Sequence, residues 1–368
     1  MKFGLFDGLA AKLRGQVSGL GAAARLTYAG ADGARQSEPL DGQDMASALD
    51  RVLGLAEASG LPVDAVGHRI VHGGLEFDRP VVLTDAVIAA LKRLEPLAPL
   101  HQPFNIAGIE AARRAFPAAR QIGCFDTAFH RRHPFVNDTF ALPYALYDAG
   151  VRRYGFHGLS YEYITGYLRH HYPDRAAGKV VVVHLGAGAS MCAIDGGRSV
   201  GSSMGFSALD GLPMATRCGQ LDPGVVLWLM QARGLQADAI ADLLYRQSGL
   251  KGISGLSGDM RELLASDDPR AAQALDYFVF RIRRELGAMA AVLGGLDTVV
   301  FCGGIGENSA VIRQRICDGF QWFDLVLDDA ANRAGAHDIS TPDSHVCVLR
   351  IETDEEQMIA RHVAALNG

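Results

Sequence analysis

The sequence has few cysteines, no long hydrophobic run and no excess of positive charge, and each lack excludes a class of protein. Six cysteines are scattered along 368 residues without a C-x-x-C pair, which excludes a secreted disulfide framework. The longest uncharged apolar run, 180–194, is too short to span a bilayer, and residues 1–6 do not begin a signal peptide. The formal charge of −6 argues against a general nucleic-acid-binding protein. We therefore predict a cytoplasmic protein with reduced thiols and a small-molecule partner, acting on neither nucleic acid nor membrane.

The sequence does contain short β-branched runs that alternate with longer helical stretches, a pattern typical of α/β proteins. At roughly 150 residues per domain, the length suggests two domains. No internal repeat is visible. Strands are expected at 65–72, 120–125, 179–185, 298–302 and 345–351. Helices are expected at 44–59, 84–94, 105–116, 161–171, 223–232, 269–293 and 355–366.

Two glycine clusters, 186–188 and 303–306, each follow a predicted buried strand. Glycine-rich backbone at the carboxyl end of a strand is where open α/β sheets hold ligands, although each cluster alone could be a simple tight turn. A helix capped by Asn308 or Ser309 is expected after the second cluster, with N–H groups available to an anion. Neither cluster matches the P-loop pattern, which excludes a P-loop NTPase. The first lacks the third glycine of a dinucleotide fingerprint, so a dinucleotide oxidoreductase is a weaker alternative.

Charged side chains stand in apolar surroundings at strand ends and glycine turns. Arg69 and Arg217 cannot lose their charge and need anionic partners, and Asp126 follows the predicted strand 120–125. Each could be part of a buried salt bridge. Taken together, they favour a site for a phosphate or carboxylate ligand. The charge-rich stretch 131–133 is interpreted instead as a solvated face.

Several segments carry a resemblance to a known family: 68–74, 100–105, 124–130, 153–160, 184–190, 210–219, 252–261, 301–309 and 353–360. On these motifs the chain resembles the acetokinase family, the acetate kinases of the actin-like ATPase superfamily. The resemblance implies an α/β fold of two actin-like (ribonuclease H-like) domains flanking an active-site cleft. The implied amino-terminal domain is 1–129 with 355–368, and the implied nucleotide-binding and dimerisation domain is 130–354. A homodimer is implied as well.

The resemblance implies a reaction, reversible transfer of the ATP γ-phosphate to acetate by direct in-line displacement, with Mg²⁺ or Mn²⁺ as the metal. It also implies roles for particular residues. The implied catalytic residues are Asp126, Arg69, Arg217 and His157, and the implied metal ligand is Glu355. The implied acetate pocket consists of Arg69, Val71, Leu100 and Ala208, the last replacing a proline that is common there. The implied nucleotide contacts are Lys2, His184, Gly186, Gly188, Ser190, Asp259, Met260, Arg261, Gly304, Ile305, Gly306 and Asn308.

The sequence departs from the family pattern at two places. Ala187 stands where the family often has asparagine, so one side-chain contact to phosphate would be missing. Family members begin with a strand and an Asn-Ala-Gly-Ser-Ser-Ser-Leu-Lys-Phe turn, of which this sequence has Lys2 and Phe3. We therefore expect low kinase activity and a weakened first domain for the chain as written. The alternatives are a propionate or butyrate kinase, or a catalytically impaired nucleotide-binding protein.

Overall fold

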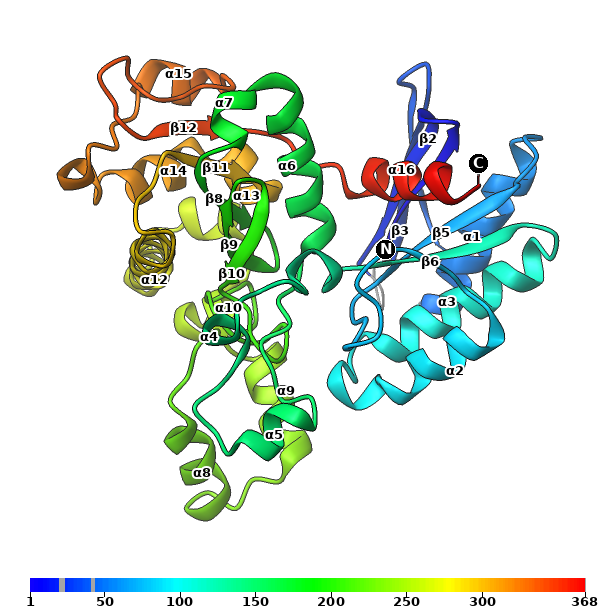
Figure 1. Cartoon of the computed structure of the whole chain (residues 1–368), viewed down its shortest axis with the longest axis horizontal. Helices are drawn as coiled ribbons and strands as arrows, with labels where there is room; N and C mark the ends of the chain where they lie inside the picture. Colours follow the sequence, from blue (N-terminus) through cyan, green and yellow to red (C-terminus); the bar gives the residue numbers. More distant parts are fainter. Residues whose placement is uncertain (20–23, 41–43, 368) are drawn as a thin grey trace. The chain divides into compact units, whose positions relative to one another are not determined.

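The computed structural model describes residues 1–19, 24–40 and 44–367. The chain divides into two compact units, of which unit 1 comprises Met1–Ala128 with Asp354–Gly368 and unit 2 comprises Phe129–Thr353. In Figure 1, unit 1 holds the blue and cyan elements together with the last helix. None of the described helices combines the length and the apolar composition that crossing a bilayer requires.

Unit 1 contains two β-sheets. Its strands are β1 (Lys2–Asp7), β2 (Ala10–Ser18), β3 (Arg25–Gly30), β4 (Arg35–Pro39), β5 (Ala65–Ile70), β6 (Val81–Val82) and β7 (Arg120–Phe125). Its helices are α1 (Met45–Ala58), α2 (Asp85–Arg93), the 3-10 turn η1 (Glu95–Leu97), α3 (Gln102–Ala115) and α16 (Glu355–Asn367). The first sheet is antiparallel in the order β1-β2-β3-β4, and the second has the order β5-β7-β6 with β5 parallel to β7.

Side-chain alternation along β5 explains how α16 packs on this strand. Residues 67 and 69 are two positions apart and so face the same side of the sheet. A Cβ atom on Gly67 would lie 2.3 Å from Cγ2 of Ile359 in α16, so the helix rests directly on bare backbone. Arg69 therefore faces the helix that begins with Glu355. Ile70 faces the other side, in a buried cluster with Ile109 of α3.

Unit 2 is built around one five-stranded sheet. Its strands are β8 (Lys179–Leu185), β9 (Ala189–Asp195), β10 (Arg198–Ser202), β11 (Thr298–Cys302) and β12 (Cys347–Arg350). Its helices are α4 (Phe135–Asp138), α5 (Tyr144–Asp148), α6 (Gly158–His171), α7 (Pro173–Ala176), α8 (Pro223–Gln231), α9 (Ala237–Arg246), α10 (Gly249–Ser254), α11 (Met260–Leu264), α12 (Pro269–Leu293), α13 (Gly303–Asn308), α14 (Ala310–Cys317) and α15 (Asp329–Ala334). Two 3-10 turns, η2 (Ala128–His130) and η3 (Gln321–Phe323), complete the chain.

The sheet of unit 2 has the strand order β10-β9-β8-β11-β12, with β8, β11 and β12 parallel. Alternate residues of β8 face opposite sides, and Val180 and Val182 join Tyr161 and Ile164 of α6 in one buried cluster. The helix α12 contacts β8, β9 and β10. Figure 1 shows α6 and α12 on opposite sides of this sheet. The core of unit 2 is therefore a helix–sheet–helix sandwich, typical of the predicted α/β class.

The structure confirms most of the predicted elements. The strands 120–125, 179–185 and 298–302 and the helix 269–293 have the predicted bounds, and Ser309 caps α14 as expected. The simpler interpretation of the second glycine cluster, a tight turn, does not hold, because these residues form the start of α13. A positive φ of 76° at Gly303, with a virtual Cβ 2.7 Å from Leu185 O, explains why glycine is required there. All six cysteines are free, as predicted.

Candidate active site

Three charged residues of unit 1 meet at the ends of β5 and β7. Arg69 is next to last in β5, Asp126 directly follows β7, and Glu355 opens α16. Arg69 donates from Nε to Asp126 Oδ1 at 2.9 Å and from Nη2 to Asp126 Oδ2 at 2.7 Å. Its Nε atom also lies 3.5 Å from Glu355 Oε2. The structure therefore brings Arg69 and Asp126 together with Glu355, which lies 286 positions after Arg69 in the sequence (355 minus 69).

The electrostatics of this cluster are those of a buried carboxylate beside a partly exposed guanidinium. The Asp126 side chain is 2% exposed and that of Arg69 is 41% exposed. Burial raises the pKa of the Asp126 carboxyl, and the attraction of Arg69 opposes this shift. Burial alone would lower the pKa of Arg69, but Asp126 and Glu355 outweigh it, so the net pKa is raised. Arg69 is thus a permanent cation whose exposed part an anionic ligand can contact.

Asp126 and Glu355 are oxygen donors of the kind that a hard divalent cation prefers. Among the described residues, no group of three or more His, Cys, Asp or Glu side chains is placed to hold a metal ion by itself. Magnesium is commonly bound through only one or two carboxylates, with phosphates and water supplying the remaining oxygens. The two carboxylates therefore fit a metal that arrives with the phosphates of a nucleotide.

Two predicted acetate-pocket residues, Val71 and Leu100, also belong to unit 1 and are partly buried. The backbone N–H of Val71 donates to Asn105 Oδ1 at 3.0 Å. Asn105 lies in the first turn of α3, and Leu100 lies two residues before this helix begins. The pocket residue Val71 is thus tied to the start of α3. Sequence reasoning gave Asn105 no role, and its place at a helix start beside a predicted pocket residue was the available signal.

The two glycine clusters lie side by side at one edge of the sheet in unit 2. β8 and β11 are parallel neighbours, with His184 paired to Cys302, so the loops that follow the two strands start from the same end of the sheet. A Cβ atom on Gly186 would lie 4.0 Å from the backbone nitrogen of Gly304. This adjacency places backbone N–H groups from both clusters in one region, as a phosphate-binding edge requires.

His157 and Arg217 both approach the loop that holds Gly188. A Cβ atom on Gly188 would lie 3.3 Å from His157 Nε2 and 3.7 Å from Arg217 Nη1. Arg217 Nη1 also donates to the carbonyl oxygen of Ala208 at 3.1 Å, so these two predicted site residues touch. The structure therefore gathers the predicted histidine and arginine on the predicted phosphate loop.

His157 is supported from behind by other side chains. Its Nδ1 atom lies 2.8 Å from Ser190 Oγ, and its ring stacks on that of His184 with centroids 4.4 Å apart. His184 Nδ1 in turn lies 2.9 Å from Ser160 Oγ. Ser190 is fully buried, so its side chain contacts His157 from inside the fold. Sequence reasoning missed Tyr161, which also bonds Ser190; its position one helical turn after His157 was the available signal.

Most of the predicted nucleotide contacts outside the segment 184–190 lie at or within two short helices, α11 and α13. Asp259 caps α11 and pairs with Arg261, whose side chain is 89% exposed, while Met260 is buried. The hydrogen bonds from Arg261 lower the pKa of Asp259 to about 2. In the second segment, Gly304, Ile305, Gly306 and Asn308 all lie in α13, where Asn308 Nδ2 donates to Gly304 O at 2.9 Å. Lys2 is the exception, because it lies in β1 of unit 1 and is exposed.

A buried polar network lies beneath the turn that carries His157. His130 Nε2 lies 2.9 Å from the carbonyl oxygen of Phe156, and its Nδ1 lies 2.8 Å from Ser199 Oγ. His133 Nε2 lies 2.7 Å from the same Ser199 oxygen. Burial lowers the pKa of His130 to about 3 and that of His133 to about 4. The interpretation of 131–133 as a solvated face was therefore wrong for His133, and for Arg131, whose side chain is 10% exposed.

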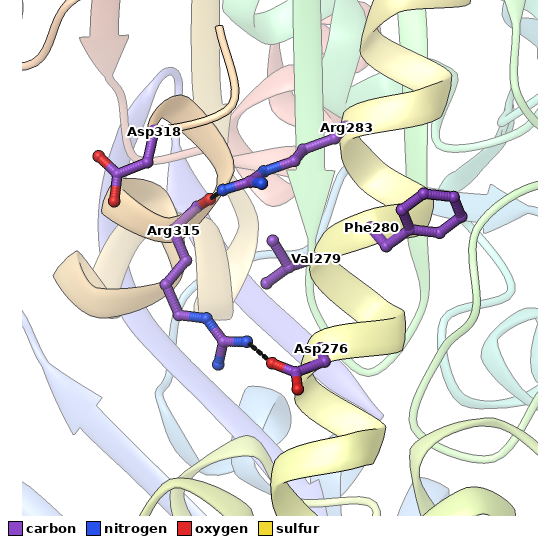
Figure 2. Close-up of a pocket in the computed structure, with 6 residues that line it drawn as sticks. All are labelled: Asp276, Val279, Phe280, Arg283, Arg315 and Asp318. Carbon is purple, nitrogen blue, oxygen red and sulfur yellow. Dashed lines mark hydrogen bonds and ion pairs between the residues drawn. The ribbon is translucent and has the colours of Figure 1, made fainter.

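A pocket of about 330 Å³ lies between α12 and α14, away from these residues (Figure 2). Its lining includes none of the predicted site residues. Its charges are already partnered, because Arg315 Nη2 donates to Asp276 Oδ1 at 2.5 Å and Arg283 donates to the carbonyl oxygens of Arg315 and Ile316. Figure 2 shows both arginines turned to these partners. We interpret this pocket as part of the packing between the two helices.

Comparison with known proteins agrees with this geometry. A family model described as the acetokinase family matches residues 1–361. A curated acetate kinase of Methylocella silvestris is 57% identical over 383 aligned positions, which cover 100% of this chain and 95% of that protein. The solved acetate kinase of Porphyromonas gingivalis is 36% identical with a TM-score of 0.86, covering 97% of this chain and 94% of that one. The solved propionate kinase of Francisella tularensis is 32% identical with a TM-score of 0.92, covering 99% and 96%.

The fold shared with these solved kinases, together with the matching family model, defines a phosphotransferase of the actin-like class. The chain belongs to the acetokinase family. The predicted family, the α/β fold class with two actin-like domains and the enzyme class are thereby confirmed. The individual site residues and the domain boundaries, 1–129 with 355–368 and 130–354, stay predictions.

Proposed function

We propose that this protein transfers the γ-phosphate of ATP reversibly to acetate, forming acetyl phosphate and ADP. The observation that carries the proposal is the approach of His157 Nε2 and Arg217 Nη1 to the loop at Gly188. Two nitrogen donors facing a glycine-rich loop suit a phosphoryl group in transfer. The similarity to curated proteins named acetate kinase supports the choice of acetate.

The mechanism follows from the charges of the reactants. Acetate is ionised at neutral pH, so a general base has no proton to remove. Both reactants are anions, and the difficulty is their repulsion. Arg69 would bind the carboxylate, and Arg217 would offset the charge that develops on the phosphoryl oxygens. His157 would donate a hydrogen bond to one of those oxygens, and no covalent enzyme intermediate is needed.

A divalent metal is part of the proposal. Asp126 and Glu355 would hold it, with Mg²⁺ as the expected ion and Mn²⁺ as an alternative. When bound, the metal supplies positive charge that offsets the charge of the phosphates. Asp126 would have a second role, because its two hydrogen bonds with Arg69 orient the guanidinium group. It is therefore a positioning and metal-side residue and not a base.

The test is an assay of acyl phosphate with the purified chain. Acetyl phosphate formed from acetate and ATP is trapped as the hydroxamate, with separate controls that omit acetate, ATP or the metal. We expect product only when all three are present. Binding of ATP without any hydroxamate would instead support the catalytically impaired nucleotide-binding protein.

A propionate kinase is the second candidate, because one similar solved structure is described as a propionate kinase. Ala208, in place of the family's usual proline, has a smaller side chain, and its carbonyl oxygen accepts from Arg217 Nη1. One methylene changes discrimination by only about 1–3 kcal/mol, so the two activities differ in degree. The ratio of kcat/KM for acetate, propionate and butyrate decides between them.

We propose that unit 2 binds a second copy of this chain, so that the protein is a homodimer. The helix α8 is apolar along most of its length, and none of its residues is buried. Leu227 and Trp228 are 54% and 52% exposed. Trp228→Glu should shift the protein from dimer to monomer in light scattering coupled to gel filtration. Trp322→Glu, at a 73% exposed tryptophan outside this helix, is the matched control and should leave the mass unchanged. A monomeric parent protein would contradict the assignment.

Two other expectations stay predictions. The cytoplasmic location is tested by fractionating native cells and probing each fraction with an antibody. The active-site cleft flanked by two domains is tested by a crystal structure with a bound nucleotide.

A further inference from the structure

The two ring nitrogens of His157 have different surroundings. Nε2 faces the Gly188 loop, and Nδ1 lies 2.8 Å from Ser190 Oγ, whose residue is fully buried in β9. A neutral imidazole carries its proton on only one nitrogen. Under the proposed function, on which this inference rests, Nε2 has to donate to a phosphoryl oxygen. The proton must therefore sit on Nε2, and Nδ1 must accept.

Tyr161 supplies what this arrangement needs. It lies in the first turn of α6, four residues after the N-cap His157, and its side chain is fully buried. Its hydroxyl forms a short hydrogen bond with Ser190 Oγ. The phenol is the more acidic of the two hydroxyls and is the natural donor of this pair.

A count of the protons on Tyr161, Ser190 and His157 gives an arrangement in which Nε2 is the donor. The serine hydroxyl has a single proton and accepts through its lone pairs. If Tyr161 donates to Ser190, then the proton of Ser190 is left for His157 Nδ1. The ring proton of His157 then sits on Nε2, on the side of the phosphate loop.

We propose that Tyr161 and Ser190 are positioning residues that hold His157 in the Nε2–H form, ready to donate to the transferring phosphoryl group. In the opposite tautomer, a lone pair on Nε2 would face the phosphoryl oxygens and repel them. This role differs from the phosphate contact that the sequence predicts for Ser190. It gives a function to Tyr161, which the sequence left without one.

Two further groups lie close to the His157 ring. His184 stacks on the face of the His157 ring and bonds Ser160 through its own Nδ1. Arg217 approaches from the loop side with donors only. Ser190 is thus the group at Nδ1 that can both donate and accept.

The experiment uses the full-length protein with ¹⁵N-labelled histidine. Long-range ¹H–¹⁵N spectra report which nitrogen of His157 carries the proton, and His157→Asn assigns the signal. We expect the Nε2–H form in the parent protein and a mixture of forms in Ser190→Ala. Observation of the Nδ1–H form in the parent protein overturns the proposal by itself, whether or not the variants fold.

Kinetics supply the second readout. Ser190→Ala should lower kcat about tenfold, and Tyr161→Phe about threefold, with KM for acetate and ATP nearly unchanged. Because Tyr161 acts through Ser190, the double variant should be no slower than Ser190→Ala. Independent, multiplying effects of the two substitutions would overturn the proposal.

Tyr154→Phe is the matched control. Tyr154 is a buried tyrosine of the same unit whose hydroxyl donates to Gly150 O at 2.7 Å. The Tyr154→Phe variant should lose about as much stability as Tyr161→Phe without changing the tautomer of His157. An equal change of the His157 tautomer in the two variants would overturn the proposal. The tautomer is read without turnover. A parent protein with the Nε2–H form but no acetyl phosphate would therefore contradict the proposed function and leave the positioning role intact.

Discussion

His157 adopts a left-handed backbone conformation, with a φ of 56°, that non-glycine residues rarely take. Such a conformation costs about 1–2 kcal/mol and persists only where neighbouring contacts stabilise it. Here His130 bonds the carbonyl of the preceding residue, Phe156, and α6 begins immediately afterwards. The strain turns the imidazole towards the Gly188 loop. Backbone strain and candidate chemistry thus coincide at one residue.

Arg217 gives the most direct residue-scale prediction. Arg217→Ala should reduce kcat by roughly 150-fold or more, because removing one donor to the developing charge costs about 3 kcal/mol. The hydroxamate assay measures the rate, and circular dichroism checks that the fold persists. Arg217→Lys keeps the charge but loses the planar fork, so we expect only partial recovery. A rate within a few-fold of the parent protein for Arg217→Ala would remove Arg217 from the mechanism.

At the scale of elements, α16 positions Glu355 by packing on the bare backbone of β5. Gly67→Ala should lower both stability and activity, because the new Cβ would lie 2.3 Å from Ile359 and push the helix away. Gly54→Ala is the matched control, since a Cβ at this site in α1 meets nothing within 4 Å. It should raise stability by up to about 1 kcal/mol. Urea unfolding compares the two, and equal effects would contradict the packing argument.

The turn before α6 gives an element-scale prediction about pH. His130 and His133 are buried with pKa values lowered to about 3 and about 4, whereas histidines of the unfolded chain titrate near 6.5. Below about pH 6.5 the unfolded chain therefore binds protons that the folded chain does not. Stability should fall by up to about 1.4 kcal/mol per pH unit for each histidine as the pH drops from there towards 4.

Urea unfolding at several pH values between 7.5 and 4.5 measures this slope. His130→Gln should flatten it, because the variant has one fewer buried neutral histidine. His170→Gln, at an exposed histidine of α6, should leave it unchanged. Equal slopes for the parent protein and His130→Gln would show that His130 does not contribute.

At the scale of the whole molecule, the last helix returns the chain to unit 1, so that Glu355 joins residues contributed by the first third of the sequence. The strand β1 lies at one edge of its sheet and β5 at one edge of the other, and α16 contacts both.

Local patterns in the sequence were enough to predict the buried parallel strands and the longer helices. Buried strands such as 179–185 are continuous β-branched runs, and α12 has start signals in Asp268 and Pro269 and a stop signal in Gly294. The strands β2 and β4 were not predicted, because polar residues interrupt their apolar pattern; β2 is mostly partly buried and β4 is largely exposed. The sequence left open whether the second glycine cluster forms a simple turn, and only the structure shows that these residues begin α13.

The sequence alone determined the chemistry of individual residues, because charge and glycine content are properties of each position. The family and the candidate site residues could therefore be predicted from the sequence. The partners of those residues could not. Strand register and helix packing decide that Arg69 pairs with Asp126 and Glu355. They also decide that Ser190 contacts His157 from the interior and that Tyr161 forms a hydrogen bond with Ser190. These contacts join residues distant in sequence, and only a folded backbone sets their distances and directions.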